Sequence, residues 1–108
     1  MADSKHIVVL ITAETQGQAR EIADDLLEKK LAACINMVPR VQSKFWWRGK
    51  IDSANESLLI IKTRAALLDK VIASVKRKHS YTVPEIIAMP IVGGNTDYLD
   101  WIDESTQK

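Results

Sequence analysis

Two side chains of this sequence have the chemistry of metal ligands, although they lie far apart in the chain. His79 continues the apolar stripe of a helical pattern at its C-terminal end, and imidazole is a common ligand of copper and zinc. Cys34 is the only cysteine, and its thiolate could complete such a site. Each has a simpler alternative: a partly buried histidine at a helix end, and a cysteine that only packs.

The same two residues are the only candidates for catalysis. A nucleophilic pair of Cys34 and His79 is conceivable because they come from different elements, but no third residue suggests itself to orient them. The sequence contains no nucleotide fingerprint, catalytic triad or paired-acid arrangement. We therefore expect a binding protein and not an enzyme.

The longest element that the sequence predicts is a hairpin over residues 34–63. Its first arm runs into Phe45-Trp46-Trp47, a turn follows at residues 48–50, and the second arm contains Leu58-Leu59-Ile60-Ile61. Successive side chains of a strand point to opposite faces, so four consecutive large aliphatic residues need cover on both faces of the sheet.

The elements around the hairpin predict the order βαββαβ. The patterns indicate a strand at 7–11, a helix from the N-cap Thr15 to about residue 30, a helix at 64–78 capped by Thr63, a strand at 86–92 and a short last helix. Pro90 cannot donate a ladder hydrogen bond, which puts its strand at a sheet edge. The prediction is one α+β domain over residues 1–108: a ferredoxin-like antiparallel sheet with strands one and three central, and two helices on one face.

The second face of this sheet has no cover in the predicted fold, because the extra C-terminal helix is too short for it. Large exposed apolar patches mark interfaces, so we expect other copies of the chain to cover this face. The aromatic residues expected in that interface are Phe45, Trp46, Trp47 and Trp101.

Composition excludes several partners. The 108 residues include 15 basic and 14 acidic side chains, with a net charge of +1, which argues against nucleic acid and against an anionic membrane surface. Residues 1–6 lack the apolar core of a signal peptide, and the sequence contains no apolar run of about 18 residues. These features predict a cytoplasmic protein.

Five separated strings of the sequence resemble the CutA family of divalent-cation tolerance proteins, at the family's spacings, over about residues 7–105. They are Leu31-Ala32-Ala33-Cys34-Ile35-Asn36, Trp46-Trp47-Arg48-Gly49, Leu59-Ile60-Ile61-Lys62-Thr63, the run from His79 to Ile87, and Gly94-Asn95-Thr96-Asp97-Tyr98-Leu99-Asp100-Trp101. The resemblance implies a ferredoxin-like homotrimer of PII-like architecture, cytoplasmic residence, copper tolerance and binding of Cu(II) or related divalent ions. In animals the family is also associated with membrane anchoring of acetylcholinesterase.

In some bacterial members of the family that this sequence resembles, metal ligands stand at three positions. The resemblance implies one of these ligands for this chain. Ile11 stands in place of a cysteine and Lys78 in place of a histidine, so only His79 matches. Copper binding is therefore expected to be weak.

An alternative function comes from the polar residues inside the family strings. Lys62 closes a run of aliphatic residues and needs an anionic partner, for which Glu85 is our candidate. Together with Tyr81 and Tyr98, these two residues could line clefts between subunits that bind a small anionic ligand, as in a PII-like signalling trimer. A purely structural salt bridge between subunits is the other interpretation.

Overall fold

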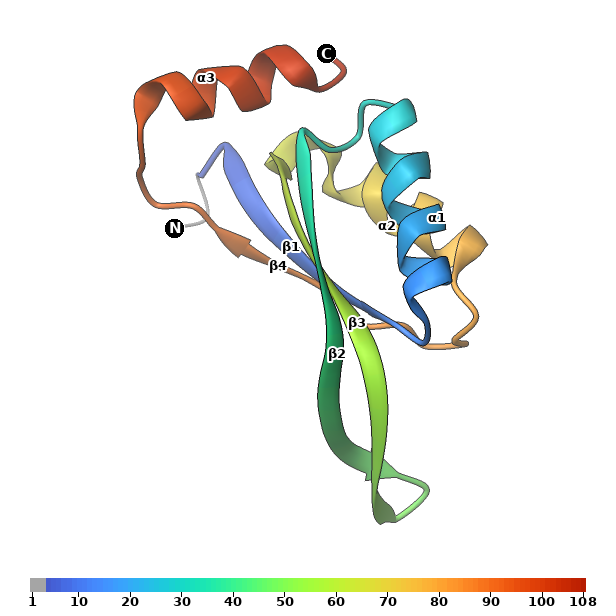
Figure 1. Ribbon diagram of the computed structural model, residues 1–108. Helices are drawn as coiled ribbons and strands as arrows, with labels where there is room; N and C mark the ends of the chain where they lie inside the picture. The colour runs from blue at the N-terminus through green and yellow to red at the C-terminus, as the bar shows by residue number, and fades with distance from the viewer. Residues whose placement is uncertain (1–3) are drawn as a thin grey trace.

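The computed structural model describes residues 4–108, which form an antiparallel sheet with the strand order β2-β3-β1-β4 (Figure 1). The predicted order βαββαβ and the two central strands are confirmed, as is the edge position of the strand that contains Pro90. The elements are β1 (His6–Ala13), α1 (Gln16–Glu28), β2 (Cys34–Trp47), β3 (Lys50–Arg64), a 3₁₀ turn (Ala65–Leu67), α2 (Leu68–Lys78), β4 (Ile86–Pro90) and α3 (Thr96–Ser105).

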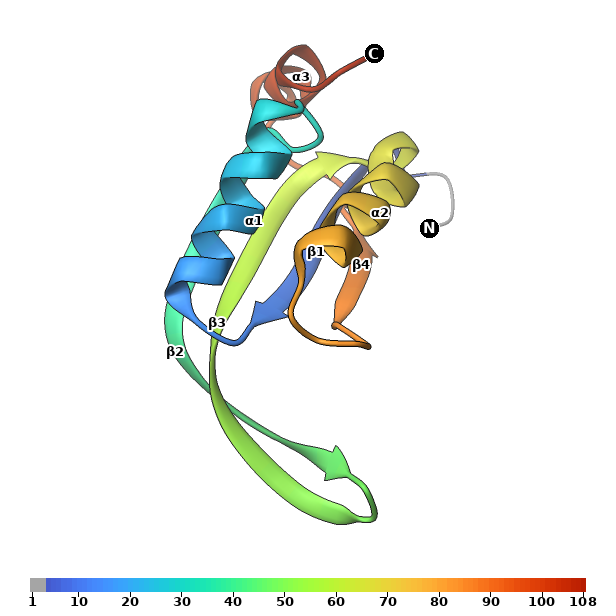
Figure 2. The same cartoon turned by 90° about the vertical axis from the view of Figure 1, so that its right-hand side faces the viewer.

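The helices α1 and α2 pack on one face of the sheet, as Figure 2 shows. Helix α1 begins at the predicted cap, where the Thr15 hydroxyl accepts a hydrogen bond from the Gln18 backbone N–H at 3.1 Å. The core between the two layers is aliphatic, and its fully buried members include Val9, Ile11, Ile22, Leu26, Leu59, Ile61 and Val71. Alternating residues of the central strands thus supply one side of the core, and the helical stripes supply the other.

The opposite face, which we call the open face, carries the alternate residues of the same strands. Its apolar members are Val8, Leu10, Val38, Leu58, Ile60, Ile87 and Met89. Helix α3 lies across one end of this face (Figure 1), where Ile102 is fully buried and the His6 Nε2 atom lies 2.9 Å from Asp103 Oδ1. The short helix therefore covers more of the open face than its length suggested, but the rest stays uncovered within one chain.

The β2–β3 hairpin extends well beyond the helices (Figures 1 and 2). A bulge between Val38 and Val41 interrupts its ladder, with Arg40 at a φ of 61°. Such a bulge bends the strand and increases its twist. At the tip, Arg48 and Gly49 both have positive φ, as a two-residue type I′ turn requires.

The prediction that Thr63 caps the second helix is wrong. Thr63 belongs to β3 and is fully buried, and its hydroxyl donates to the Leu31 carbonyl oxygen at 2.7 Å. Arg64 takes the N-cap position before the 3₁₀ turn, without a side-chain cap. The strand extends to Arg64 because its last residues still pair with β1, so the helical chain begins later than the pattern indicated.

Candidate functional site

His79 lies at the C-terminal cap of α2, and both of its ring nitrogens have protein partners. Nε2 lies 2.7 Å from the Thr12 carbonyl oxygen, and Nδ1 accepts from the Tyr81 backbone N–H at 3.0 Å. A carbonyl can only accept and an amide N–H can only donate, so these contacts assign a neutral ring with its proton on Nε2. A metal bound to Nδ1 would have to displace the Tyr81 amide. The arrangement resembles the structural histidine that the sequence left open as an alternative.

Cys34 opens β2 and is half-buried on the open face, opposite Lys62 of β3. The hydroxyl of Tyr98, from α3, is close to it: burial raises the pKa of Tyr98, and the neighbouring Cys34 raises that pKa further. A tyrosine hydroxyl that stays protonated supplies no positive charge to activate a thiol. Cys34 thus lies between Lys62 of β3 and Tyr98 of α3.

The register of the sheet separates the two candidate ligands within one chain. Cys34 pairs with Lys62, which in turn pairs with Val8, whereas His79 contacts Thr12 at the other end of β1. Four residues of strand at about 3.3 Å each put about 13 Å between those ends. The Cys34–His79 nucleophilic pair is therefore not formed within the chain.

Residues 4–108 contain no group of three or more His, Cys, Asp or Glu side chains arranged as metal ligands. The position of the family cysteine is Ile11, which is fully buried in the apolar core, and Lys78 is exposed at the end of α2. These residues of one chain thus offer single donor atoms and not a preformed multidentate site.

The expected ion pair between Lys62 and Glu85 does not form within the chain. The Lys62 ammonium donates to the Asn36 side-chain oxygen on the neighbouring strand. Glu85 directly precedes Ile86, which pairs with Ile11, so it lies at the Thr12 end of the sheet. The antiparallel register places the two residues at opposite ends of β1, so a pair between them would have to join different chains, and the salt bridge between subunits stays a prediction.

The four residues proposed to line a ligand cleft consequently fall into two groups. Lys62 and Tyr98 lie near Cys34, at the end of the open face that α3 covers. Tyr81 and Glu85 belong to the segment between α2 and β4, at the opposite end. Only residues from different chains could bring the two groups together.

Tyr81 instead has a partner that the sequence did not reveal. Its hydroxyl donates to Glu56 Oε2 at 2.7 Å, and Glu56 is 8% exposed. Burial raises the pKa of Tyr81 far above its usual range, and the hydrogen bond and negative charge of Glu56 raise that pKa further. The Tyr81 ring also packs against the His79 ring, with centroids 4.7 Å apart. Tyr81 thus links the end of α2 to the base of the hairpin.

The two hairpin tryptophans are the most exposed large apolar side chains of the predicted interface set. Trp46 is 73% exposed and Trp47 is 55% exposed, while Phe45 and Trp101 are close to two-fifths exposed. Phe45 and Trp47 are on one side of the hairpin, and Trp46 pairs with Ile51 on the other. Two apolar sides of the hairpin are therefore without cover in a single chain.

Two polar contacts could not be expected from the sequence. The His6 ring, just before the first buried strand residues, is half-buried against Asp103 of α3. Arg64 donates to the Thr106 hydroxyl at 2.9 Å and so ties β3 to the end of α3. Both contacts depend on where α3 returns to the sheet, for which no local pattern gives a signal.

In the described part of the chain, no helix has the length and apolar character needed to cross a lipid bilayer.

Comparison with known proteins gives consistent matches. Residues 7–105 match the family described as CutA1 divalent ion tolerance protein. The chain is 49% identical to the divalent-cation tolerance protein CutA of Archaeoglobus fulgidus, over 94% of this chain and 99% of that protein. It is 47% identical to the chloroplastic protein CutA 1 of Oryza sativa, over 94% of this chain. The match spans only 58% of the rice protein, and 56% of the chloroplastic CutA of Arabidopsis thaliana.

Solved structures agree with the sequence matches. The crystal structure of CutA1 from Oryza sativa superposes with a TM-score of 0.94 at 46% identity, covering 97% of this chain and 96% of that one. The structure of the periplasmic divalent cation tolerance protein CutA from Archaeoglobus fulgidus gives a TM-score of 0.92 at 49% identity, covering 94% and 99%. With the matched family, these likenesses establish that the chain belongs to the CutA1 divalent ion tolerance protein family.

Proposed function

We propose that this chain is a cytoplasmic homotrimer that binds Cu(II) or a related divalent ion weakly and confers tolerance to it, without enzymatic activity. The observation that carries the proposal is membership of the divalent ion tolerance family over residues 7–105. The Archaeoglobus and Thermus relatives carry divalent-cation tolerance in their names.

The open face supports self-association. Ile87 and Met89 of β4 are about half exposed, and they continue an apolar surface across the sheet to Val38 of β2. The hairpin adds two uncovered tryptophans beyond it. Aromatic residues are enriched in the buried centres of interfaces, and apolar patches of this kind are covered in assemblies. The choice of three copies follows the family resemblance.

The donor set favours weak metal binding. His79 must give up a backbone hydrogen bond to ligate through Nδ1, and Cys34 lies at the other end of the sheet. A single imidazole or thiolate from each chain binds far less tightly than a set of three or four ligands in fixed geometry. We therefore expect a site that gains its other ligands from carboxylates, from water or from a second chain.

A Cu(II) titration against a chelating dye tests the metal proposal. We expect wild-type protein to withdraw copper from the dye, and His79→Ala to weaken this competition by about tenfold or more, the effect of losing one strong ligand. Cys34→Ser measures the thiolate contribution separately. His6→Ala is the matched control, because it removes the other imidazole of the chain. Copper uptake that is absent, or equal in wild type and His79→Ala, would contradict a site based on His79.

A further inference from the structure

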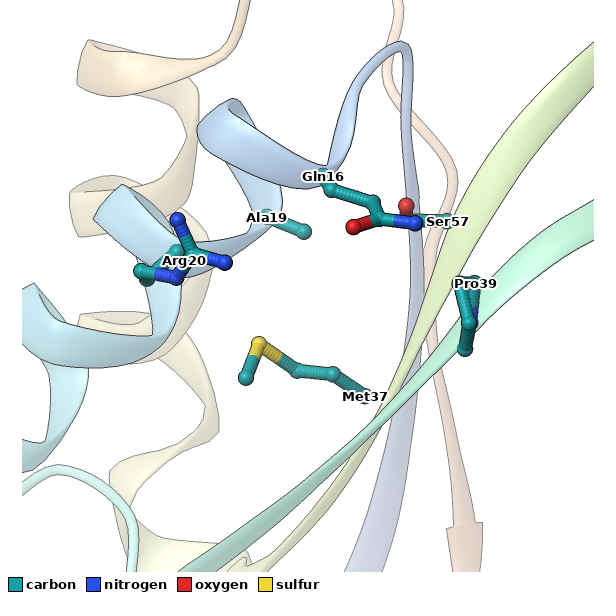
Figure 3. Close-up of a pocket in the computed structure, with 6 residues that line it drawn as sticks. All are labelled: Gln16, Ala19, Arg20, Met37, Pro39 and Ser57. Carbon is teal, nitrogen blue, oxygen red and sulfur yellow. The ribbon is translucent and has the colours of Figure 1, made fainter.

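A small pocket opens between the first turn of α1 and the bulged part of the hairpin (Figure 3). Its volume is about 180 Å³, which is enough for several water molecules. The pocket is on the helix-covered side of the sheet, whereas the open face is on the other side. Its lining residues are Gln16, Ala19, Arg20, Met37, Pro39 and Ser57.

Arg20, which is exposed, supplies a cation that forms no ion pair with the described residues. Gln16 and Arg20 are one helical turn apart on α1, so their side chains share one side of the helix and border the pocket together (Figure 3). Within residues 4–108 the side-chain ion pairs are His6–Asp103 and Lys29–Asp25, and neither involves Arg20. Its guanidinium is therefore available to an external anion.

Ser57 supplies a second polar group without a partner. The residue is 4% exposed and lines the pocket, and its hydroxyl makes no hydrogen bond with the described residues. No fully enclosed side-chain polar atom in this part of the chain lacks a partner, so the Ser57 hydroxyl must open onto the pocket. A hydroxyl that faces a small pocket in this way can bind a ligand atom or water.

The helix end and the apolar wall define the remaining chemistry. The first turn of α1 carries no acidic side chain, so its positive dipole end is not neutralised there. Ala19, Met37 and Pro39 make the rest of the wall apolar. One cation, two neutral polar groups and an apolar wall match a ligand with one negative charge and a short aliphatic part.

We infer that this pocket binds a small aliphatic monocarboxylate. The guanidinium of Arg20 can hold both carboxylate oxygens in a bidentate pair, which a lysine ammonium could not do in the same geometry. The Gln16 amide and the Ser57 hydroxyl can each donate a further hydrogen bond. The aliphatic tail contacts Met37 and Pro39, as in ligand sites where a few polar groups orient a mostly apolar contact.

Butyrate and its neutral isostere butyramide provide the test, with protein labelled at the methionine methyl groups for NMR. We expect butyrate to shift the Met37 signal saturably, with a dissociation constant in the millimolar range that suits so small a ligand. Met89 is an internal control, because it lies on the open face of the sheet. Butyramide should bind about tenfold more weakly or worse, since it cannot form a charge-assisted pair with Arg20.

Three variants complete the design. Arg20→Gln should weaken butyrate binding by about tenfold or more, and Ser57→Ala by a smaller factor. Lys76→Gln removes one positive charge from the exposed side of α2 and should leave binding unchanged. The inference is overturned if Met37 does not respond to butyrate, if butyramide binds equally well, or if Arg20→Gln and Lys76→Gln behave alike.

Discussion

Replacing Trp46 with alanine should weaken the proposed trimer more than any other single change in the hairpin. Trp46 is 73% exposed in one chain. A tryptophan offers about 150–250 Å² for burial, so about 110–180 Å² would remain for a partner to cover. At about 25 cal/mol per Å², complete cover corresponds to about 3–4.5 kcal/mol for each chain. That is an upper value, since some of this area can stay wet in the assembly.

Sedimentation velocity over a dilution series measures this effect as the concentration at which the assembly dissociates. We expect Trp46→Ala to dissociate at far higher protein concentration than wild type. Leu27→Ala is the control, because Leu27 is 40% exposed on α1, away from the hairpin and the open face. It should lower the stability of the fold but leave the dissociation concentration close to that of wild type. The reasoning is refuted if the two variants dissociate alike.

Two further variants test contacts within the chain by urea unfolding. Tyr81→Phe leaves the buried Glu56 without its donor and should cost about 1–3 kcal/mol at pH 8. Because folding raises the pKa of Tyr81 above the unfolded value of about 10, the neutral phenol stabilises the fold below that pH, and the contribution declines as the pH rises further. The difference between wild type and Tyr81→Phe should therefore shrink at pH 11, and an unchanged difference would count against the contact. Thr63→Val removes the donor to the Leu31 carbonyl and should also cost about 1–3 kcal/mol; a neutral effect would mean that the carbonyl finds another partner.

The local patterns of the sequence were sufficient for the architecture. Thr15 caps α1 as its spacing to Gln18 predicted, and Pro90 ends an edge strand as its missing N–H requires. The run of residues 58–61 alternates between the two faces as predicted: Leu59 and Ile61 are buried under the helices, and Leu58 and Ile60 lie on the open face. Each of these features depends on neighbours in the chain, so periodicity and backbone chemistry are enough to predict it.

The candidate site was predicted less well, because its contacts depend on register and on distant segments. Lys62 and Glu85 were paired by charge, and strand register puts them at opposite ends of β1, so only a contact between chains could join them. The sequence did not indicate that Glu56 is buried and hydrogen-bonded. Its partner Tyr81 belongs to the segment after α2, and only the folded chain brings this segment against β3. His79 was identified as a ligand by residue type, and the two backbone groups that occupy its nitrogens became visible only in the fold.

The most direct test of the account is a native mass spectrum of the untagged protein, recorded with and without stoichiometric Cu(II). We expect one dominant species containing three chains of 12.1 kDa, which takes up copper in the wild type and loses that uptake in His79→Ala. A monomer at micromolar concentration would contradict the assignment of the open face and the hairpin to an interface. A trimer whose copper uptake is unaffected by His79→Ala would support the assembly but contradict the proposed ligand.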